Sequence, residues 1–322
     1  MKKNIGLGYI KILLTFFLLL ILEANCALLQ EPESKIKAII WDLGHVLVET
    51  SKVSFAAEAI GVSDAIQLSA TSLFNFDVTV LTKLQEKTLN LILNYKKQTQ
   101  TENGLVLKHE NIELGEIMCQ WLKGEIQGDE VISALQEYIK ICELRGDVFS
   151  CESEQNVISN IINLMFNSRS LAYHTKPIEK IIPILKSCKD NGLKMVMLTN
   201  WNDRAFNELY KSEHTREIFN FFRKDEIFVS GFLGVIKPST LAYKHATDLL
   251  FIRYGIKPEE CLMIDDQPEN IEGAKLCGIQ GLLFEKGKDR CQILRSNLIR
   301  LGLLPTMEPE MQAKSWFSSM WS

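Results

Sequence analysis

Polar side chains follow short apolar runs at three places in the sequence, and a lysine precedes a proline at a fourth. These residues are Asp42, Thr199 with Asn200, Asp265 with Asp266, and Lys237. Short apolar runs such as Ala38 to Trp41 are typical of strands buried in a parallel sheet. Because the carboxyl ends of parallel strands meet at one edge of a sheet, we expect the polar residues to lie together.

Together these side chains would suit the transfer of a phosphoryl group. Asp42 could attack phosphorus and form an aspartyl-phosphate, which divides hydrolysis into two steps. Thr199 and the backbone N–H groups that follow it would hold the phosphoryl oxygens. Lys237 and a magnesium ion would offset the phosphate charge, and carboxylates such as Asp266 are the oxygen ligands that Mg²⁺ prefers.

Each of these residues also has a purely structural interpretation. Asp42 or the Asp265-Asp266 pair could cap a helix, Thr199 could do the same, and Lys237 could be a solvated loop cation. Taken singly, the structural and functional interpretations have similar weight. All four places in this order are hard to explain as helix caps, and they favour phosphoryl transfer.

The pattern around these residues predicts an α/β fold, a Rossmann-like doubly wound parallel sheet with an inserted helical cap domain. Strands and helices alternate after residue 170, with one helix expected from Pro177 to Lys189, and this order predicts right-handed crossovers. Residues 51–169 carry mostly helical patterns, including one from Ile112 to Leu122. We therefore predict a core of residues 36–50 and 170–304, a cap of residues 51–169 and a tail of residues 305–322.

Residues 1–26 have the layout of a secretory signal peptide. Lysines come first, Ile12 to Leu22 is almost wholly apolar, and Ala24-Asn25-Cys26 follows. The apolar run is short for a bilayer, so we predict export to the periplasm or the exterior, with no stable membrane span after cleavage. An uncleaved membrane anchor is the alternative.

Overall composition argues against two other classes of site. Lysine and arginine total 36 against 40 acidic residues, which leaves no electrostatic footprint for nucleic acid. Beyond residue 26 the cysteine count is odd and no CxxC occurs, so neither a disulfide framework nor a zinc site is indicated. A single disulfide stays open if the protein is exported.

Four segments resemble the motifs of the haloacid dehalogenase-like (HAD) hydrolases. They are Asp42-Leu43-Gly44, Leu198-Thr199-Asn200, Lys237-Pro238 and Ile264-Asp265-Asp266. The stretch from Ile264 to Ala274 is similar to that of bacterial sugar-phosphate phosphatases, such as the α-glucose-1-phosphatase group. The resemblance covers about residues 36–50 and 172–288, and it implies a Rossmann-like core, a helical cap and Mg²⁺ dependence.

The resemblance also implies a role for each matching residue. Asp42 would be the nucleophile and a metal ligand, Gly44 would offer its backbone carbonyl to the metal, and Asp266 would complete the site. Thr199, Asn200 and Lys237 would bind the phosphoryl group, and Thr199 and Lys237 would also act in catalysis. Asp265 is a further metal-site residue, either as a metal ligand or as a residue that positions the ligands without contacting the metal.

Gly44 departs from the motif of most family phosphatases, which carry a second aspartate there as general acid and base. Losing such a group typically slows catalysis by about 10²–10⁴-fold. The sugar-phosphatase group also has glycine at this place, and the neighbouring His45 is one substitute. We expect a phosphatase acting on a small phosphate ester such as a sugar phosphate. The alternatives are an exported binding or effector protein and a metal-independent 2-haloacid dehalogenase.

Overall fold

The computed structural model describes residues 35–51, 58–60, 83–84, 86–92, 95, 107–109, 112–146 and 148–306. Residues 36–294 form one compact unit, and residues 295–306 belong to a second unit with the chain ends. The predicted signal peptide and most of the predicted tail lie outside the described residues. Within the described part, no helix has the length and apolar character needed to cross a membrane.

Five parallel strands form the central sheet, in the order β7-β6-β1-β8-β9. They are β1 (Ala38–Trp41), β6 (Lys194–Thr199), β7 (Ile227–Val229), β8 (Cys261–Asp265) and β9 (Gln280–Leu283). The central strand β1 is buried along its whole length, as its apolar run predicts. It pairs with β6 on one side and β8 on the other. The predicted doubly wound parallel sheet is confirmed.

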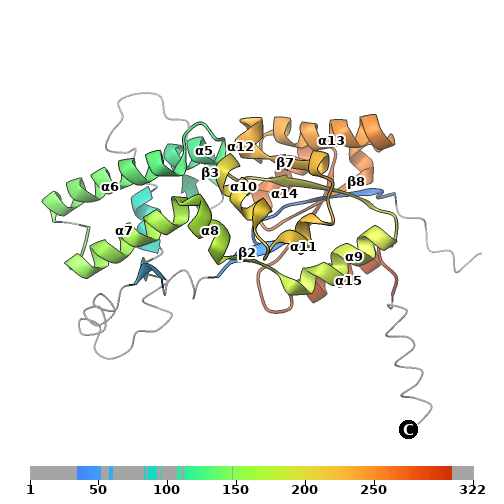
Figure 1. Ribbon diagram of the computed structural model, residues 1–322. Helices are drawn as coiled ribbons and strands as arrows, with labels where there is room; N and C mark the ends of the chain where they lie inside the picture. The colour runs from blue at the N-terminus through green and yellow to red at the C-terminus, as the bar shows by residue number, and fades with distance from the viewer. Residues whose placement is uncertain are drawn as a thin grey trace, which may run out of the picture. The chain divides into compact units, whose positions relative to one another are not determined.

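Helices cover both faces of this sheet (Figure 1). Those of the core are α9 (Ile182–Asp190), α10 (Asp203–Lys211), α11 (Arg216–Phe219), α12 (Ser230–Leu233), α13 (Thr240–Tyr254) and α14 (Pro268–Leu276), and α15 (Arg290–Arg300) follows. Side chains of α13 and α14 pack with those of β1, β6 and β8 in one apolar cluster. Figure 1 shows α9 on the opposite side of the sheet from α13.

Along the sequence, a helical insertion separates β1 from the other strands of the central sheet. The chain leaves through β2 (Val48–Thr50) and returns through β5 (Thr175–Pro177), and these two strands pair antiparallel. Between them the structure describes β3 (Leu107–His109), β4 (Ile112–Leu114), α5 (Glu116–Leu122), α6 (Gly128–Arg145), α7 (Glu152–Phe166) and α8 (Ser168–His174). The insertion lies where we predicted the cap, and its function as a cap stays a prediction.

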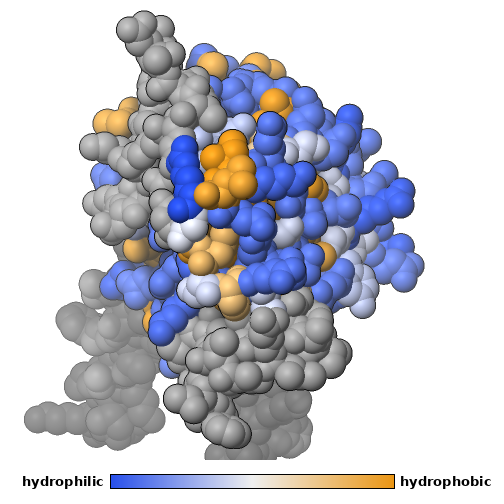
Figure 2. Space-filling view, turned by 90° about the vertical axis from the view of Figure 1, so that its left-hand side faces the viewer, coloured by the Kyte–Doolittle hydropathy of each residue, from blue (hydrophilic) through white to orange (hydrophobic). Residues whose placement is uncertain are grey.

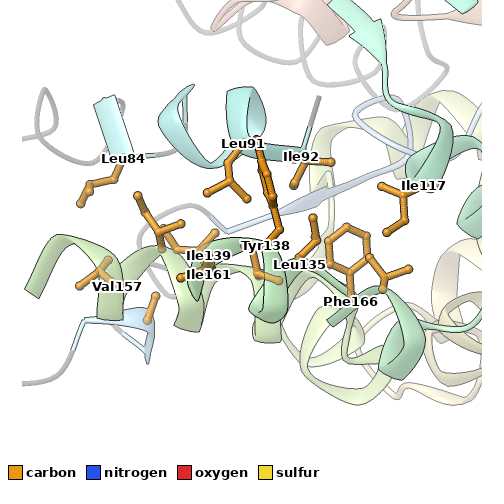
Figure 3. Packing of buried hydrophobic residues seen from close by; sticks show 14 of the residues in the cluster. Leu84, Leu91, Ile92, Ile117, Leu135, Tyr138, Ile139, Val157, Ile161 and Phe166 are labelled. Carbon is orange, nitrogen blue, oxygen red and sulfur yellow. The ribbon is translucent and has the colours of Figure 1, made fainter. Parts of the chain in front are cut away.

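The insertion has an apolar core of its own. Figure 3 shows side chains of α6 and α7 meeting Leu84, Leu91 and Ile92 from the preceding segment. Ala205 of α10 belongs to the same cluster, and Trp201 packs against it. The apolar core of the insertion therefore continues into the helix that follows β6.

The face of the molecule in Figure 2 is mostly hydrophilic, with small apolar groups between the polar side chains.

Two predicted helix starts are wrong. The helix expected from Ile112 begins only at Glu116, because Ile112–Leu114 pairs with Leu107–His109 as a hairpin. Pro177 does not begin a helix either, because it pairs with Val48 in the β2–β5 ladder. Pro183 instead takes the first turn of α9, where a missing N–H group is harmless. Ile112 is held by the neighbouring strand of a hairpin, whereas Pro177 is held by a strand partner that is distant in the sequence.

Candidate active site

Asp42 lies at the carboxyl end of β1, where a tight loop turns the chain back. Its N–H group donates to the Ile264 carbonyl at 2.9 Å and extends the ladder by one residue. The N–H groups of Leu47 and Val48 both donate to the Leu43 carbonyl. His45 has a φ of 58°, which is uncommon for a residue other than glycine. The loop thereby places Gly44 and His45 beside Asp42 at the wall of a cavity.

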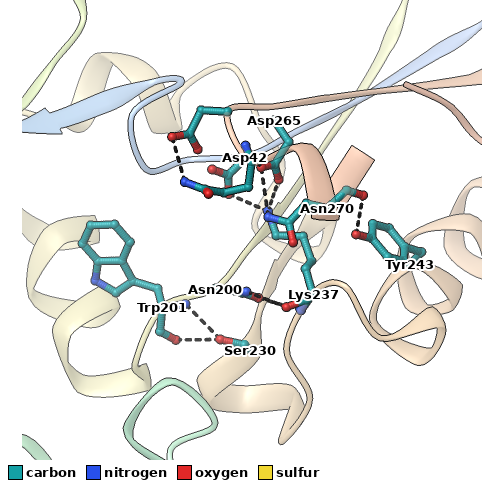
Figure 4. A network of polar contacts seen from close by, with 10 residues as sticks. Asp42, Asn200, Trp201, Ser230, Lys237, Tyr243, Asp265 and Asn270 are labelled. Atoms are coloured by element: carbon teal, nitrogen blue, oxygen red, sulfur yellow. Dashed lines mark hydrogen bonds and ion pairs between the residues drawn. The ribbon is translucent and has the colours of Figure 1, made fainter. Parts of the chain in front are cut away.

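Lys237 is buried between two carboxylates. Its Nζ atom lies 2.7 Å from Oδ1 of Asp42 and 2.6 Å from Oδ2 of Asp265 (Figure 4). Burial alone would lower the pKa of Lys237, but the two carboxylates outweigh it and raise that pKa. Lys237 therefore stays charged and can offset negative charge next to Asp42, and its predicted contact with the phosphoryl group stays a prediction.

Asp265 is fully occupied by the protein. Its Oδ2 atom binds Lys237, and its Oδ1 atom accepts hydrogen bonds from the backbone N–H of Gln267 and from Nδ2 of Asn270, both at 2.9 Å. Its side chain is completely buried. Two roles were left open for Asp265. This geometry favours a positioning role over a role as metal ligand, because both carboxylate oxygens already accept hydrogen bonds within the protein.

The residues present fit a magnesium ion. Oxygen atoms of Asp42, Asp265 and Asp266 lie within 4.8 Å of one another. Burial raises the pKa of Asp42 to about 7, which Lys237 opposes and Asp265 increases. Burial and then Asp265 also raise the pKa of Asp266. A divalent cation would relieve this crowding of buried negative charge, and Asp42, Asp266 and the Gly44 carbonyl would hold it.

Thr199 and Asn200 complete the site from the end of β6. Thr199 is buried as the last residue of the strand and lines the cavity. The Asn200 side chain forms two hydrogen bonds with the backbone of Lys237, donating to its carbonyl at 3.0 Å and accepting from its N–H at 2.8 Å. This gives Asn200 a positioning role for Lys237, and its predicted contact with substrate stays a prediction.

The cavity has a volume of about 290 Å³. Its lining contains every predicted site residue except Asp265. It adds residues that sequence reasoning did not assign to a site, which are Val48, Thr50, Trp201, Gln267 and Asn270. None of the described residues between 51 and 174 lines it. For Trp201 a signal was present, because it directly follows the Thr199-Asn200 motif.

Comparison with known proteins assigns the family. The sequence profile of the haloacid dehalogenase-like hydrolases matches residues 36–278, about three quarters of the chain. The protein belongs to the haloacid dehalogenase-like hydrolase family. The match spans the helical insertion and four of the five strands of the central sheet, which are β1, β6, β7 and β8, so the predicted HAD family is confirmed. The sugar-phosphatase subtype stays a prediction.

Two fungal proteins are similar in sequence to this HAD-like hydrolase. A drimenol cyclase from Aspergillus calidoustus is 25% identical over 231 residues, which are 70% of this chain and 34% of that protein. A sesquiterpene phosphatase from Aspergillus oryzae is 26% identical over 120 residues, which are 37% of this chain and 57% of that protein. The matched regions thus span about a third and somewhat over half of these relatives.

Solved structures of HAD family enzymes are also similar. One is an enzyme from Bacteroides thetaiotaomicron in complex with magnesium and inorganic phosphate, with a TM-score of 0.43 and 17% identity over 81% of this chain and all of that chain. Another is a hydrolase from Deinococcus radiodurans with bound phosphate and sodium, with a TM-score of 0.46 and 16% identity over 85% of this chain and all of that chain. At this level of identity and TM-score, the activities and ligands of these enzymes are not assigned to this protein.

Proposed function

We propose that this protein is a Mg²⁺-dependent phosphatase that hydrolyses a small phosphate ester through an aspartyl-phosphate on Asp42. The observation that carries the proposal is the buried cluster in which Lys237 contacts Asp42 while Asp266 stands close to both carboxylates. Thr199 shares the same cavity. A nucleophile, a fixed cation, a hydroxyl group and acids for a metal ion therefore meet at one point.

The geometry supports a two-step reaction. A carboxylate oxygen of Asp42 attacks phosphorus, the ester P–O bond breaks, and the departing alcohol oxygen takes a proton from water in the cavity, since Gly44 has no acidic side chain. Water then attacks the phosphorus atom of the aspartyl-phosphate, which releases phosphate and restores Asp42. Lys237 offsets charge throughout, and a bound Mg²⁺ ion would polarise a phosphoryl oxygen.

The similarity to a sesquiterpene phosphatase supports phosphate-ester hydrolysis and raises a second substrate class, esters of apolar alcohols, beside the predicted sugar phosphates. The crowding of three carboxylates argues against a metal-independent 2-haloacid dehalogenase, because Lys237 offsets only part of their negative charge and a metal ion would offset the rest. A binding or effector protein with a weakened site is the remaining alternative. The reason to consider it is that Gly44 lacks the acidic side chain that most family phosphatases carry at this position.

The test is phosphate release from an aryl phosphate, with magnesium and with a chelator, by the native protein and by Asp42→Asn. We expect metal-dependent turnover that falls by at least about 10³-fold in the variant, because the nucleophile is lost. Asp225→Asn is the matched control, since Asp225 is half exposed and pairs with Arg253 away from the cavity. It should retain activity.

A folded protein that releases no phosphate from aryl, alkyl or sugar phosphates would reject the proposal. The binding or effector alternative would then explain Gly44 as a disabling change. Equal turnover with magnesium and with chelator would reject the metal site while leaving Asp42 as nucleophile.

A further inference from the structure

The cavity wall also carries an aromatic and an apolar side chain. Trp201 and Val48 form part of it, together with His45 and Thr50. Figure 4 shows the indole of Trp201 beside the polar network, where only the backbone of Trp201 takes part in hydrogen bonds. Among the described residues, its Nε1 atom has no hydrogen-bond partner. Because this N–H group is buried, the part of the indole that lines the cavity consists of carbon atoms and is apolar.

The side-chain amide N–H groups that line the cavity are already used by the protein, and Oδ1 of Asn270, which has no hydrogen-bond partner among the described residues, is buried away from solvent. Both polar atoms of Asn200 bind the backbone of Lys237. Gln267 donates its Nε2 group to Asp266 at 3.1 Å, and Asn270 donates its Nδ2 group to Asp265. Sugar hydroxyls entering here would give up water for few partners, which is unfavourable for binding. An apolar group in the same place gives up no hydrogen bonds to water.

The position of Trp201 is fixed on both sides of its backbone. Its N–H group donates to Oγ of Ser230 at 2.9 Å, and its carbonyl accepts from the N–H of Gly231 at 3.0 Å. Ser230 in turn donates to the Leu122 carbonyl of α5 at 2.6 Å. The indole is thus held between the insertion and the Asp42 loop.

The indole also occupies the space in front of Gly44. A Cβ atom built on Gly44 would lie 3.5 Å from Cζ3 of Trp201, and Trp201 packs against the apolar core of the insertion. The ring therefore stands beside the loop that carries the nucleophile, where the alcohol part of an ester would leave. A rigid, preformed apolar wall favours an apolar group there, because little ordering is needed on binding.

We propose that Trp201 is a specificity-determining residue and that the site takes monophosphate esters of apolar alcohols in preference to sugar phosphates. The proposal rests on the phosphatase function proposed above and names the substrate class for that same site. Removal of the leaving group's apolar surface from water against the indole supplies the preference. The charged cluster around Asp42 treats the phosphoryl group of both ester classes alike.

The test compares kcat/KM for octyl phosphate and for glucose 1-phosphate. The native protein should prefer octyl phosphate by at least about tenfold, which is the discrimination that an apolar pocket typically achieves. In Trp201→Gln we expect the ratio to fall about tenfold, mainly through a higher KM for octyl phosphate. In Trp201→Phe, which keeps an aromatic face, it should stay within about threefold of the native ratio.

Trp121→Phe is the matched control. Trp121 is a buried tryptophan of the same apolar cluster that does not line the cavity, so its substitution should leave the ratio unchanged. A native preference for glucose 1-phosphate, or an unchanged ratio in Trp201→Gln, would overturn the role of Trp201 while leaving the phosphatase function intact. Release of phosphate from neither ester, nor from an aryl phosphate, would instead reject the phosphatase function and the specificity with it.

Discussion

At the scale of single residues, the site depends on carboxylates that the fold buries, where the charged form is unfavourable. Asp42 is nearly buried, and burial raises its pKa to about 7 even though Lys237 contacts it. Burial raises the pKa of Asp266 as well. Such groups hold protons that the same residues lose in the unfolded chain. A site of this kind gains most from a ligand that replaces those protons, and a divalent cation is such a ligand.

We therefore predict that magnesium stabilises the protein more at high pH than at low pH. Since the folded-state pKa values of Asp42 and Asp266 are raised, ionisation of these groups reduces the stability of the metal-free protein as pH rises from about 4 through about 7. Magnesium should then raise Tm by about 3 °C or more near pH 8 and by less near pH 5. Thermal unfolding with magnesium and with chelator measures this, and equal shifts at both pH values would contradict it.

Gly44 leads to a second prediction at this scale. Because a Cβ atom there meets only the edge of Trp201 at 3.5 Å, Gly44→Asp should fold with a Tm within about 2 °C of the native value. The new carboxyl group would stand where most family phosphatases carry their general acid. We expect kcat on alkyl phosphates to rise by up to about 10²-fold, and to change less on aryl phosphates, whose leaving group needs no proton.

Gly44→Asn is the control for that variant, because it has the same size and no acidic proton. A comparable rise in both variants, or a fall in both, would show that shape rather than proton transfer governs the effect. Steady-state kinetics on one alkyl and one aryl ester distinguishes these outcomes.

At the scale of elements, the end of α5 is attached to the loops that form the site. Asn202 donates to the Trp121 carbonyl at 2.9 Å, and Ser230 donates to the neighbouring Leu122 carbonyl. The backbones then come so close that a Cβ atom on Gly124 would lie 2.5 Å from the Gly231 carbonyl oxygen. Two buried polar side chains thus satisfy carbonyl groups that a helix end leaves without intrahelical partners.

Asn202 allows this attachment to be tested separately from its other role. Its Oδ1 atom accepts from the N–H groups of Arg204 and Ala205 at the start of α10, while its Nδ2 group reaches α5. Asn202→Asp keeps the first role and places a charge against the Trp121 carbonyl. We expect it to lower the free energy of unfolding by about 1–3 kcal/mol, measured by urea denaturation.

Asn167→Asp is the matched control for this variant. Asn167 accepts the same kind of hydrogen bonds at the start of α8, but it is exposed to solvent. An aspartate suits such a position, so its effect should stay within about 0.5 kcal/mol. Equal effects at both positions would mean that the contact with α5 contributes little.

At the scale of the whole molecule, we propose that the protein is exported and that its first 26 residues are removed. The basis is the sequence pattern alone, since these residues lie outside the described part of the structure. We predict that protein recovered from a secreting host begins at Ala27, as intact-mass spectrometry would show. A recovered chain that retains residues 1–26 and fractionates with membranes would support the uncleaved anchor instead.

Much of the site was predictable because its residues follow local patterns. The buried strands β6 and β8 end in Thr199 and Asp265, Asp42 directly follows β1, and parallel pairing brings those ends to one edge. The start of α9 was not predictable in this way. Val48 pairs with Pro177 across the whole insertion, and no local pattern reveals such a partner.

The sequence by itself determined the family, the parallel sheet and the residues that carry charge, because strand periodicity and motif chemistry are properties of neighbouring residues. Only the tertiary structure decided how these residues share their contacts. It directed Oδ2 of Asp265 and the side-chain amide of Asn200 to Lys237, and it brought Trp201 in front of Gly44. Hydrogen bonds and packing between distant segments depend on distances in space, and those exist only once the chain has folded.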